Sequence, residues 1–91
     1  MAVIDFEFMH QQLARYLLAS GQQGLSLPAL HARLRQEGFP QVTAETVEHQ
    51  LTKLASDGLV EERRGSGFSP APRWRMTRDG EEQAKKEGIY A

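Results

Sequence analysis

The 91-residue sequence contains no cysteine, which excludes disulfides, thiolate metal ligands and cysteine nucleophiles. It has no apolar run near the roughly 20 residues that a membrane-spanning helix needs. Its first segment, residues 1–9, carries acids and no basic flank, which is not typical of a signal peptide. These absences fit a reducing compartment, and we expect a cytoplasmic protein that does not interact with membranes.

Side chains with catalytic or metal-ligating chemistry are scarce and scattered. His10, His31 and His49 fall in three different predicted helices without metal-ligand spacing, which favours surface or packing histidines over a zinc site. The serines lack the sequence context of a hydrolase nucleophile. The segment 65–67, Gly-Ser-Gly, is too short for a phosphate-binding loop. We therefore expect no catalytic residue, no metal, no cofactor and no enzyme activity.

Positive charge is confined to one part of the chain, although the formal net charge is only −1. Residues 59–78 contain five arginines against two glutamates, whereas residues 1–58 and 79–91 are each net negative. Such a local concentration of arginine inside a near-neutral chain indicates a possible contact surface for an anionic partner.

Three segments carry apolar residues at spacings of three and four, which predicts three helices. The first runs from Asp5 to about Ser20, the second starts at a Ser26 cap and ends before Gly38, and the third runs from a Thr43 cap to Ser56. The expected buried stripes are Phe6, Met9, Leu13 and Leu17, then Leu27, Leu30 and Leu34, and then Ala44, Val47, Leu51 and Leu54.

The period then changes to two, which predicts a β-hairpin with strands over 59–64 and 73–77 and a long Gly/Pro-rich tip. Trp74 and Met76 share one face of the second strand, and Trp74 with Leu59 is expected to cover the open end of the helical core.

A weak final helix is expected from a Thr77 cap to Glu87, with Ala84 as its one apolar residue. Ile89 and Tyr90 beyond it either dock on the body or fray.

Three phrases of the sequence resemble the winged helix-turn-helix superfamily. Leu-Ser-Leu-Pro-Ala-Leu at 25–30 resembles the point where a short strand enters the second helix. The stretch 47–61, an apolar helix followed by Asp-Gly-Leu-Val-Glu, resembles the third helix running into the wing. Trp-x-Met-Thr-x-x-Gly at 74–80 is similar to the end of the wing in bacterial MarR- and PadR-type regulators.

The resemblance implies a mainly helical α+β fold, with a three-helix core, a β-hairpin wing and a short C-terminal helix. We expect residues 1–91 to form one winged-helix domain, with its core at about 5–82 and a tail at 83–91.

The resemblance also implies that the helix over 43–56 enters the major groove of duplex DNA while the wing follows the backbone. Its residues expected to contact bases or phosphates are Thr43, Thr46, His49, Gln50 and Lys53. Glu45 and Glu48 count against this role, because they are expected on the same outward side and repel phosphate.

The arginines of the wing are the stronger candidates for contact with phosphate: Arg63, Arg64, Arg73 and Arg75. The alternative is that they form the solvated face of the ribbon, with two of them paired to Glu61 and Glu62 across it.

Two functions remain open at this stage. The first is a DNA-binding transcriptional regulator or accessory factor, which could dimerise through Phe6, Phe8 and Met9 because Phe8 lies off the core stripe. The second is a winged-helix module that binds a protein partner within a larger complex, for which an acidic helix is no handicap. The arginine wing and the resemblance favour duplex DNA. The sequence assigns no role to Phe68.

Overall fold

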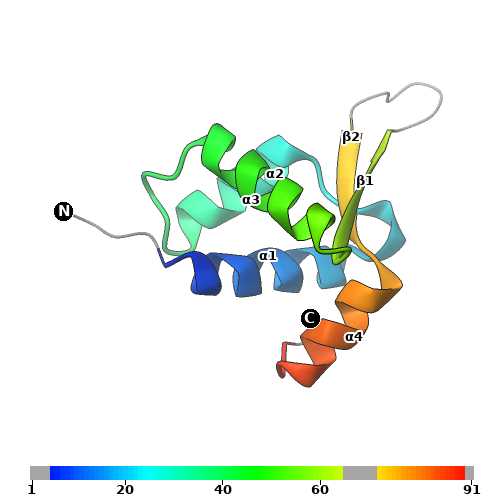
Figure 1. Ribbon diagram of the computed structural model, residues 1–91. Helices are drawn as coiled ribbons and strands as arrows, with labels where there is room; N and C mark the ends of the chain where they lie inside the picture. The colour runs from blue at the N-terminus through cyan, green and yellow to red at the C-terminus, as the bar shows by residue number, and fades with distance from the viewer. Residues whose placement is uncertain (1–4, 65–71, 90–91) are drawn as a thin grey trace.

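The computed structural model describes residues 5–64 and 72–89 and has the order of helices and strands that the sequence predicts (Figure 1). The expected tip of the hairpin, which includes Phe68, lies outside the described residues, and so does Tyr90. The elements are α1 (Phe6–Ser20), a 3₁₀ turn η1 (Gly21–Gln23), α2 (Leu27–Gln36), α3 (Ala44–Ser56), β1 (Val60–Arg64), β2 (Pro72–Met76) and α4 (Arg78–Lys86).

Each α-helix begins at a polar residue whose side chain accepts a hydrogen bond from a backbone N–H of the first turn. The predicted caps Ser26, Thr43 and Thr77 are confirmed, and Asp5 does the same for α1. Since the first N–H groups of a helix have no partner within it, these side chains fix the start of each helix.

The core forms where α1, α2 and α3 pack their apolar stripes together. Its centre consists of side chains that are 0–1% exposed, namely Met9, Leu13, Leu17, Leu30, Leu34, Val47 and Leu51. Burying each such side chain stabilises the fold by about 1.5–3 kcal/mol before conformational entropy is counted. Phe6, which the sequence places on the same stripe, is instead 44% exposed because it lies in the first turn of α1, at the edge of this core.

The hairpin is attached to the helices through Trp74, which is 6% exposed. On one side Trp74 pairs with Glu62 of β1, and on the other its backbone forms two hydrogen bonds with Leu25, of 2.8 and 2.9 Å. The short extended piece that the sequence predicts before α2 is therefore confirmed at Leu25. A Cβ on Gly24 would lie 2.4 Å from the Trp74 carbonyl oxygen, so only glycine permits this approach.

The junction between α3, the hairpin and α4 is held by Thr77. Its hydroxyl donates to the Gly58 carbonyl (2.6 Å) and accepts from the Gly80 N–H (2.9 Å). A Cβ on Gly80 would lie 1.9 Å from the Leu59 carbonyl oxygen, so α4 rests directly on the start of the hairpin. The Trp-x-Met-Thr-x-x-Gly segment at 74–80 thus supplies the residues that join α4 closely to the start of the hairpin.

The short helix α4 packs despite its low apolar content. Ala84 is 2% exposed and Ile89 is 5% exposed, so Ile89 docks on the body rather than fraying. The Ile89 N–H donates to the Ala84 carbonyl (2.9 Å), which turns the chain back toward the helix. In Figure 1, α4 follows the end of β2 and lies below the hairpin.

Candidate nucleic-acid interface

The outward face of α3 presents four of the five residues expected there. His49 and Lys53 are exposed, Thr43 is exposed at the cap, and Thr46 is half-buried. The hydroxyls of Thr43 and Thr46 lie 2.9 Å apart and hydrogen-bond to each other, while the Thr43 oxygen also accepts from the Thr46 N–H. These two side chains are therefore engaged in ordering the start of the helix.

The prediction that Gln50 faces outward is wrong. Gln50 is 7% exposed, and its Oε1 accepts a hydrogen bond from Nε2 of His10 on α1 at 2.7 Å. The reason is helical geometry, since position 50 follows Val47 by three residues and precedes Leu54 by four. Gln50 thus belongs to the buried stripe and joins α3 to α1.

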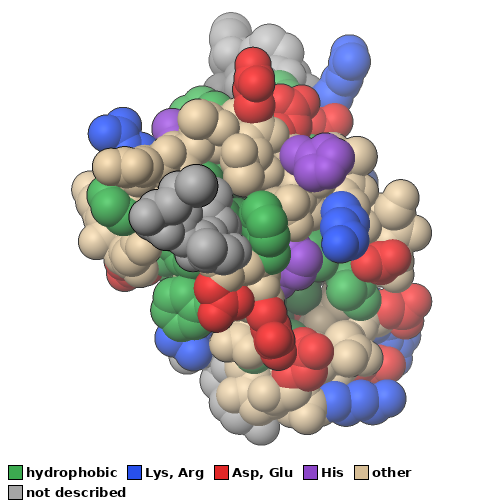
Figure 2. Space-filling view, turned by 60° about the vertical axis from the view of Figure 1, so that its left-hand side comes forward, with side chains coloured by type: hydrophobic (Ala, Val, Ile, Leu, Met, Phe, Trp, Pro, Cys, Tyr) green, Lys and Arg blue, Asp and Glu red, His purple; other side chains and the backbone are tan. Residues whose placement is uncertain are grey.

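The remaining outward residues of α3 do not favour an anionic ligand. Glu45 and Glu48 are exposed, and Lys53 is the one lysine or arginine in the helix. On the face drawn in Figure 2, basic and acidic side chains lie interspersed rather than in one continuous basic area. The helix that usually reads bases in this fold therefore carries little attraction for phosphate.

The pairing register of the hairpin sorts its arginines by face. Arg63 lies opposite Arg73, and Arg75 lies opposite Glu61. Because side chains alternate along a strand, these four share one face, whereas Arg64 lies on the face of Trp74. The four predicted arginines therefore do not form a single surface.

Within the arginine-bearing face, only part of the charge is balanced. Arg75 Nε donates a hydrogen bond to Glu61 Oε1, and the Arg75 side chain is half-buried. Arg63 and Arg73 are exposed and have no ion pair within 4.0 Å among residues 5–64 and 72–89. The alternative of a paired ribbon face thus holds for Arg75, while Arg63 and Arg73 place two like charges directly across from each other.

Two of the histidines have structural partners inside the domain. His10 donates to Gln50, and His31 Nε2 lies 2.7 Å from the Val42 carbonyl oxygen, so it donates there. Among the described residues there is no group of three or more His, Asp or Glu side chains placed to hold a metal ion. Both histidines thus tie helices or loops to one another.

The start of α1 carries an aromatic surface. Phe6 and Phe8 are 44% and 41% exposed, and Phe8 stacks on Phe39 with ring centroids 5.7 Å apart. Met9 was predicted to lie on the same surface. It is fully buried at 0% exposure, so the prediction that Met9 takes part in a dimer contact is wrong. Met9 belongs to the core stripe that continues to Leu13.

The described helices include none that is long and apolar enough to cross a membrane.

Three helices, a strand-like residue before the second of them, and a hairpin followed by a fourth helix define a winged-helix fold. A solved structure of similar shape is the crystal structure of a possible HxlR family transcriptional factor from Thermoplasma volcanium GSS1. The similarity covers 91% of this chain and 72% of that chain, with a TM-score of 0.61 and 15% sequence identity. Comparison with protein-family models and with curated proteins gives no match. The predicted fold class is confirmed, whereas a specific kinship with MarR- or PadR-type regulators is not shown.

Proposed function

We propose that this chain binds duplex DNA as a transcriptional regulator or accessory factor, with the hairpin supplying most of the affinity. The observation that carries the proposal is the exposed pair Arg63 and Arg73. Like charges directly opposite on paired strands are destabilising, and two backbone phosphates, one bound at each arginine, would offset this repulsion. The fold shared with the HxlR-type transcriptional factor is a second support.

In this proposal, α3 contributes less of the affinity for DNA than the hairpin does. Lys53 and His49 would contact the backbone or base edges, with Thr43 and Thr46 at the start of the helix. Arg64, on the other face of the hairpin, would reach a neighbouring phosphate. Arg75 would act mainly through its pair with Glu61, which orders the strand face beside Arg63 and Arg73.

The proposal is tested by titrating a fluorescent DNA duplex at low salt and then at rising salt. We expect binding by the wild-type chain to weaken steeply with salt, and the double variant Arg63→Ala/Arg73→Ala to reduce the log–log salt slope by about 2. Arg15→Ala/Arg35→Ala, which removes two exposed arginines outside the hairpin, is the charge-matched control and should leave the slope unchanged. Salt-independent or absent binding by the wild type, or an unaltered double variant, contradicts the proposal.

Two copies of the chain are proposed to associate through Phe6 and Phe8, since dimers are the usual way in which small domains read paired DNA half-sites. The support is the aromatic surface at the start of α1. Light scattering of the wild type and of Phe6→Ser/Phe8→Ser tests it, and a wild type that is monomeric at high concentration contradicts it.

A further inference from the structure

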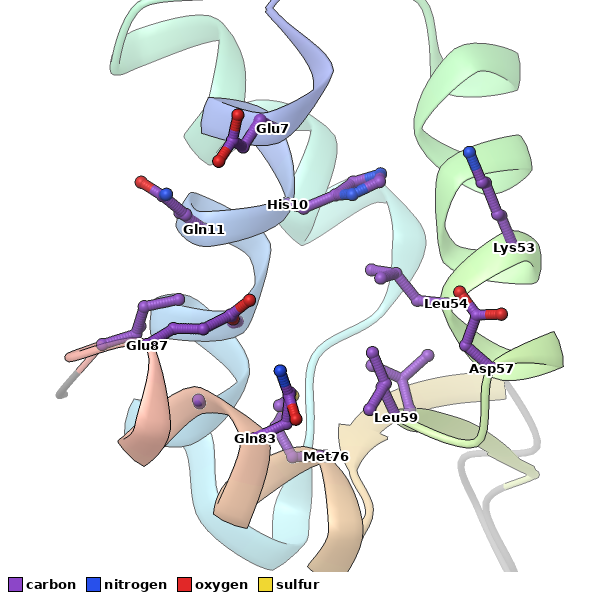
Figure 3. A pocket seen from close by; sticks show the side chains of 15 residues that line it. Glu7, His10, Gln11, Lys53, Leu54, Asp57, Leu59, Met76, Gln83 and Glu87 are labelled. Carbon is purple, nitrogen blue, oxygen red and sulfur yellow. The ribbon is translucent and has the colours of Figure 1, made fainter.

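A groove separate from the arginine face runs between α1, the end of α3, the start of β1 and α4 (Figure 3). Its cavity volume of about 380 Å³ is at the lower end of the range for ligand pockets, roughly 300–1,000 Å³. The floor is apolar, and its half-buried members are Ala14, Leu59 and Met76. Leu54 and Leu59 extend toward its centre in Figure 3.

The rim of this groove is acidic. Glu7 of α1, Asp57 after α3 and Glu87 after α4 border it, against a single lysine, Lys53, and no arginine. All three carboxylates are exposed, and none forms an ion pair within 4.0 Å among the described residues. Figure 3 shows Asp57 and Glu87 on opposite sides of the groove.

Two of these acids lie at the C-terminal ends of helices, where a negative charge is unfavourable. Asp57 is the C-cap of α3 and Glu87 is the C-cap of α4, at the negative ends of their helix dipoles. Each carboxylate therefore adds to, rather than offsets, the partial negative charge of the last carbonyl groups. Proteins tolerate such conflicts at functional sites, and a cationic side chain bound at each of the two helix ends would relieve them.

We propose that the groove docks a basic segment of a partner protein, with one large apolar side chain on the floor and Lys or Arg residues over the rim. The acidic rim repels nucleic acid, and Lys53 is the one groove residue that also belongs to the surface used by the proposed function. A metal ion does not fit, because no three ligating side chains of the described residues converge there. The inference goes beyond DNA binding and would let the domain hold a protein and a duplex at once.

The probe for this proposal is a fluorescein-labelled peptide with one leucine flanked by lysines on both sides. We expect saturable binding at low salt by fluorescence anisotropy. A peptide with glutamates in place of the lysines should not bind, and one with serine in place of leucine should bind at least about threefold more weakly. Together these peptides separate the charge requirement from the apolar one.

The rim is tested with Asp57→Asn/Glu87→Gln, which removes two unfavourable helix-end charges and so should not unfold the chain. We expect the peptide to bind about fivefold more weakly. The matched control is Glu45→Gln/Glu48→Gln, an equal change of charge on α3 outside the groove, which should leave peptide binding unchanged.

The floor is tested with Ala14→Gln, which adds bulk to a half-buried groove position of α1 without adding charge. Peptide binding should fall, while Ala32→Gln on the exposed side of α2 should have no effect. Circular dichroism verifies that each variant is folded.

The proposal is overturned by absence of saturable binding, by equal binding of the acidic peptide, or by equal losses in the rim variant and its charge-matched control. DNA titration of the same variants is a separate readout. Loss of peptide binding with DNA affinity intact, or the reverse, distinguishes failure of one proposal from failure of the other.

Discussion

The hairpin and α3 face outward from the same helical core, yet they carry opposite arrangements of charge. In the hairpin, Arg63 and Arg73 lie opposite each other and exposed. On α3, the exposed Glu45 and Glu48 outnumber the one lysine, Lys53. The fold supplies both surfaces, but the charge of each surface decides what it attracts. Under the proposed function, attraction for phosphate therefore belongs to the hairpin.

The largest expected effect comes from detaching the hairpin, through Trp74→Ala. The Trp74 side chain is buried between the hairpin and the helices, and the Trp74 backbone forms hydrogen bonds with the Leu25 backbone. We expect a loss of about 3–5 kcal/mol in the free energy of unfolding, as for other buried aromatics changed to alanine. Glu62→Ala, at the exposed position directly opposite Trp74, should stay within about 0.5 kcal/mol of wild type.

Urea denaturation measures both variants. A Trp74→Ala protein that unfolds at the same urea concentration as Glu62→Ala would mean that Trp74 does not anchor the hairpin.

A smaller loss is expected at the junction between α3 and the hairpin, from Gly80→Ala. Helix propensity alone predicts a gain of about 1 kcal/mol, because glycine is unfavourable within a helix. The added Cβ would lie 1.9 Å from the Leu59 carbonyl oxygen, so α4 must shift and the Thr77 hydrogen bonds weaken. We expect a net loss of about 1–3 kcal/mol.

Gln83→Ala, at an exposed position of the same helix, is the matched control and should be neutral or slightly stabilising. Thermal unfolding of both proteins measures the difference. Stabilisation by Gly80→Ala would contradict the packing of α4 on Leu59.

The contrast between the two surfaces is sharpened directly by Glu45→Gln/Glu48→Gln. Removing these carboxylates should raise the affinity for a DNA duplex about threefold to tenfold at low salt, since each repels phosphate at the surface of α3. Stability should change by less than about 1 kcal/mol, because both side chains are exposed. Duplex titration at two salt concentrations measures the gain, which should shrink at the higher salt. An unchanged affinity would mean that α3 does not approach the DNA.

The sequence predicted the fold well because its signals are local. Each helix or strand is specified by residues near it in the sequence. These local signals are the apolar spacing, the alternation around Trp74, and the helix caps Ser26, Thr43 and Thr77. The extended residue before α2 was predicted from a resemblance, and its pairing with Trp74 explains why glycine precedes it at Gly24.

The candidate site was predicted less well because it depends on faces and register. Gln50 was placed outside on account of its polarity, although its spacing from Val47 and Leu54 already puts it on the buried stripe. Alternation alone separates Arg63 from Arg64. That Arg63 faces Arg73 depends on the strand register, which the long connection between the strands leaves undetermined in the sequence.

The acidic groove carried almost no sequence signal. Glu7, Asp57 and Glu87 come from three separate parts of the chain, and only the packing of α4 against α1 brings them to one rim. The single local hint was the position of acids at the C-terminal ends of two helices, and the structure shows that both ends border one groove.

The smallest expected effect lies at the contact between α1 and α2, away from both charged surfaces. Tyr16 is 5% exposed, its hydroxyl donates to Glu37, and the Arg33 guanidinium lies 5.6 Å from its ring centroid. Burial and then the Glu37 carboxylate raise the pKa of Tyr16 above its ordinary value of 10.0. Because the folded state disfavours the phenolate, this stability is fully present below about pH 10 and is lost as the pH rises beyond it.

Tyr16→Phe keeps the ring under Arg33 but removes the hydroxyl, so we expect a loss of about 1 kcal/mol at neutral pH. Above about pH 10 the wild type should lose stability faster than the variant, which has no phenol at this position to titrate. Urea denaturation at about pH 7 and about pH 10.5 measures both differences. DNA affinity at neutral pH should be unchanged, since neither surface contains this contact. A variant that loses stability with rising pH as steeply as wild type would show that Tyr16 does not couple folding to pH.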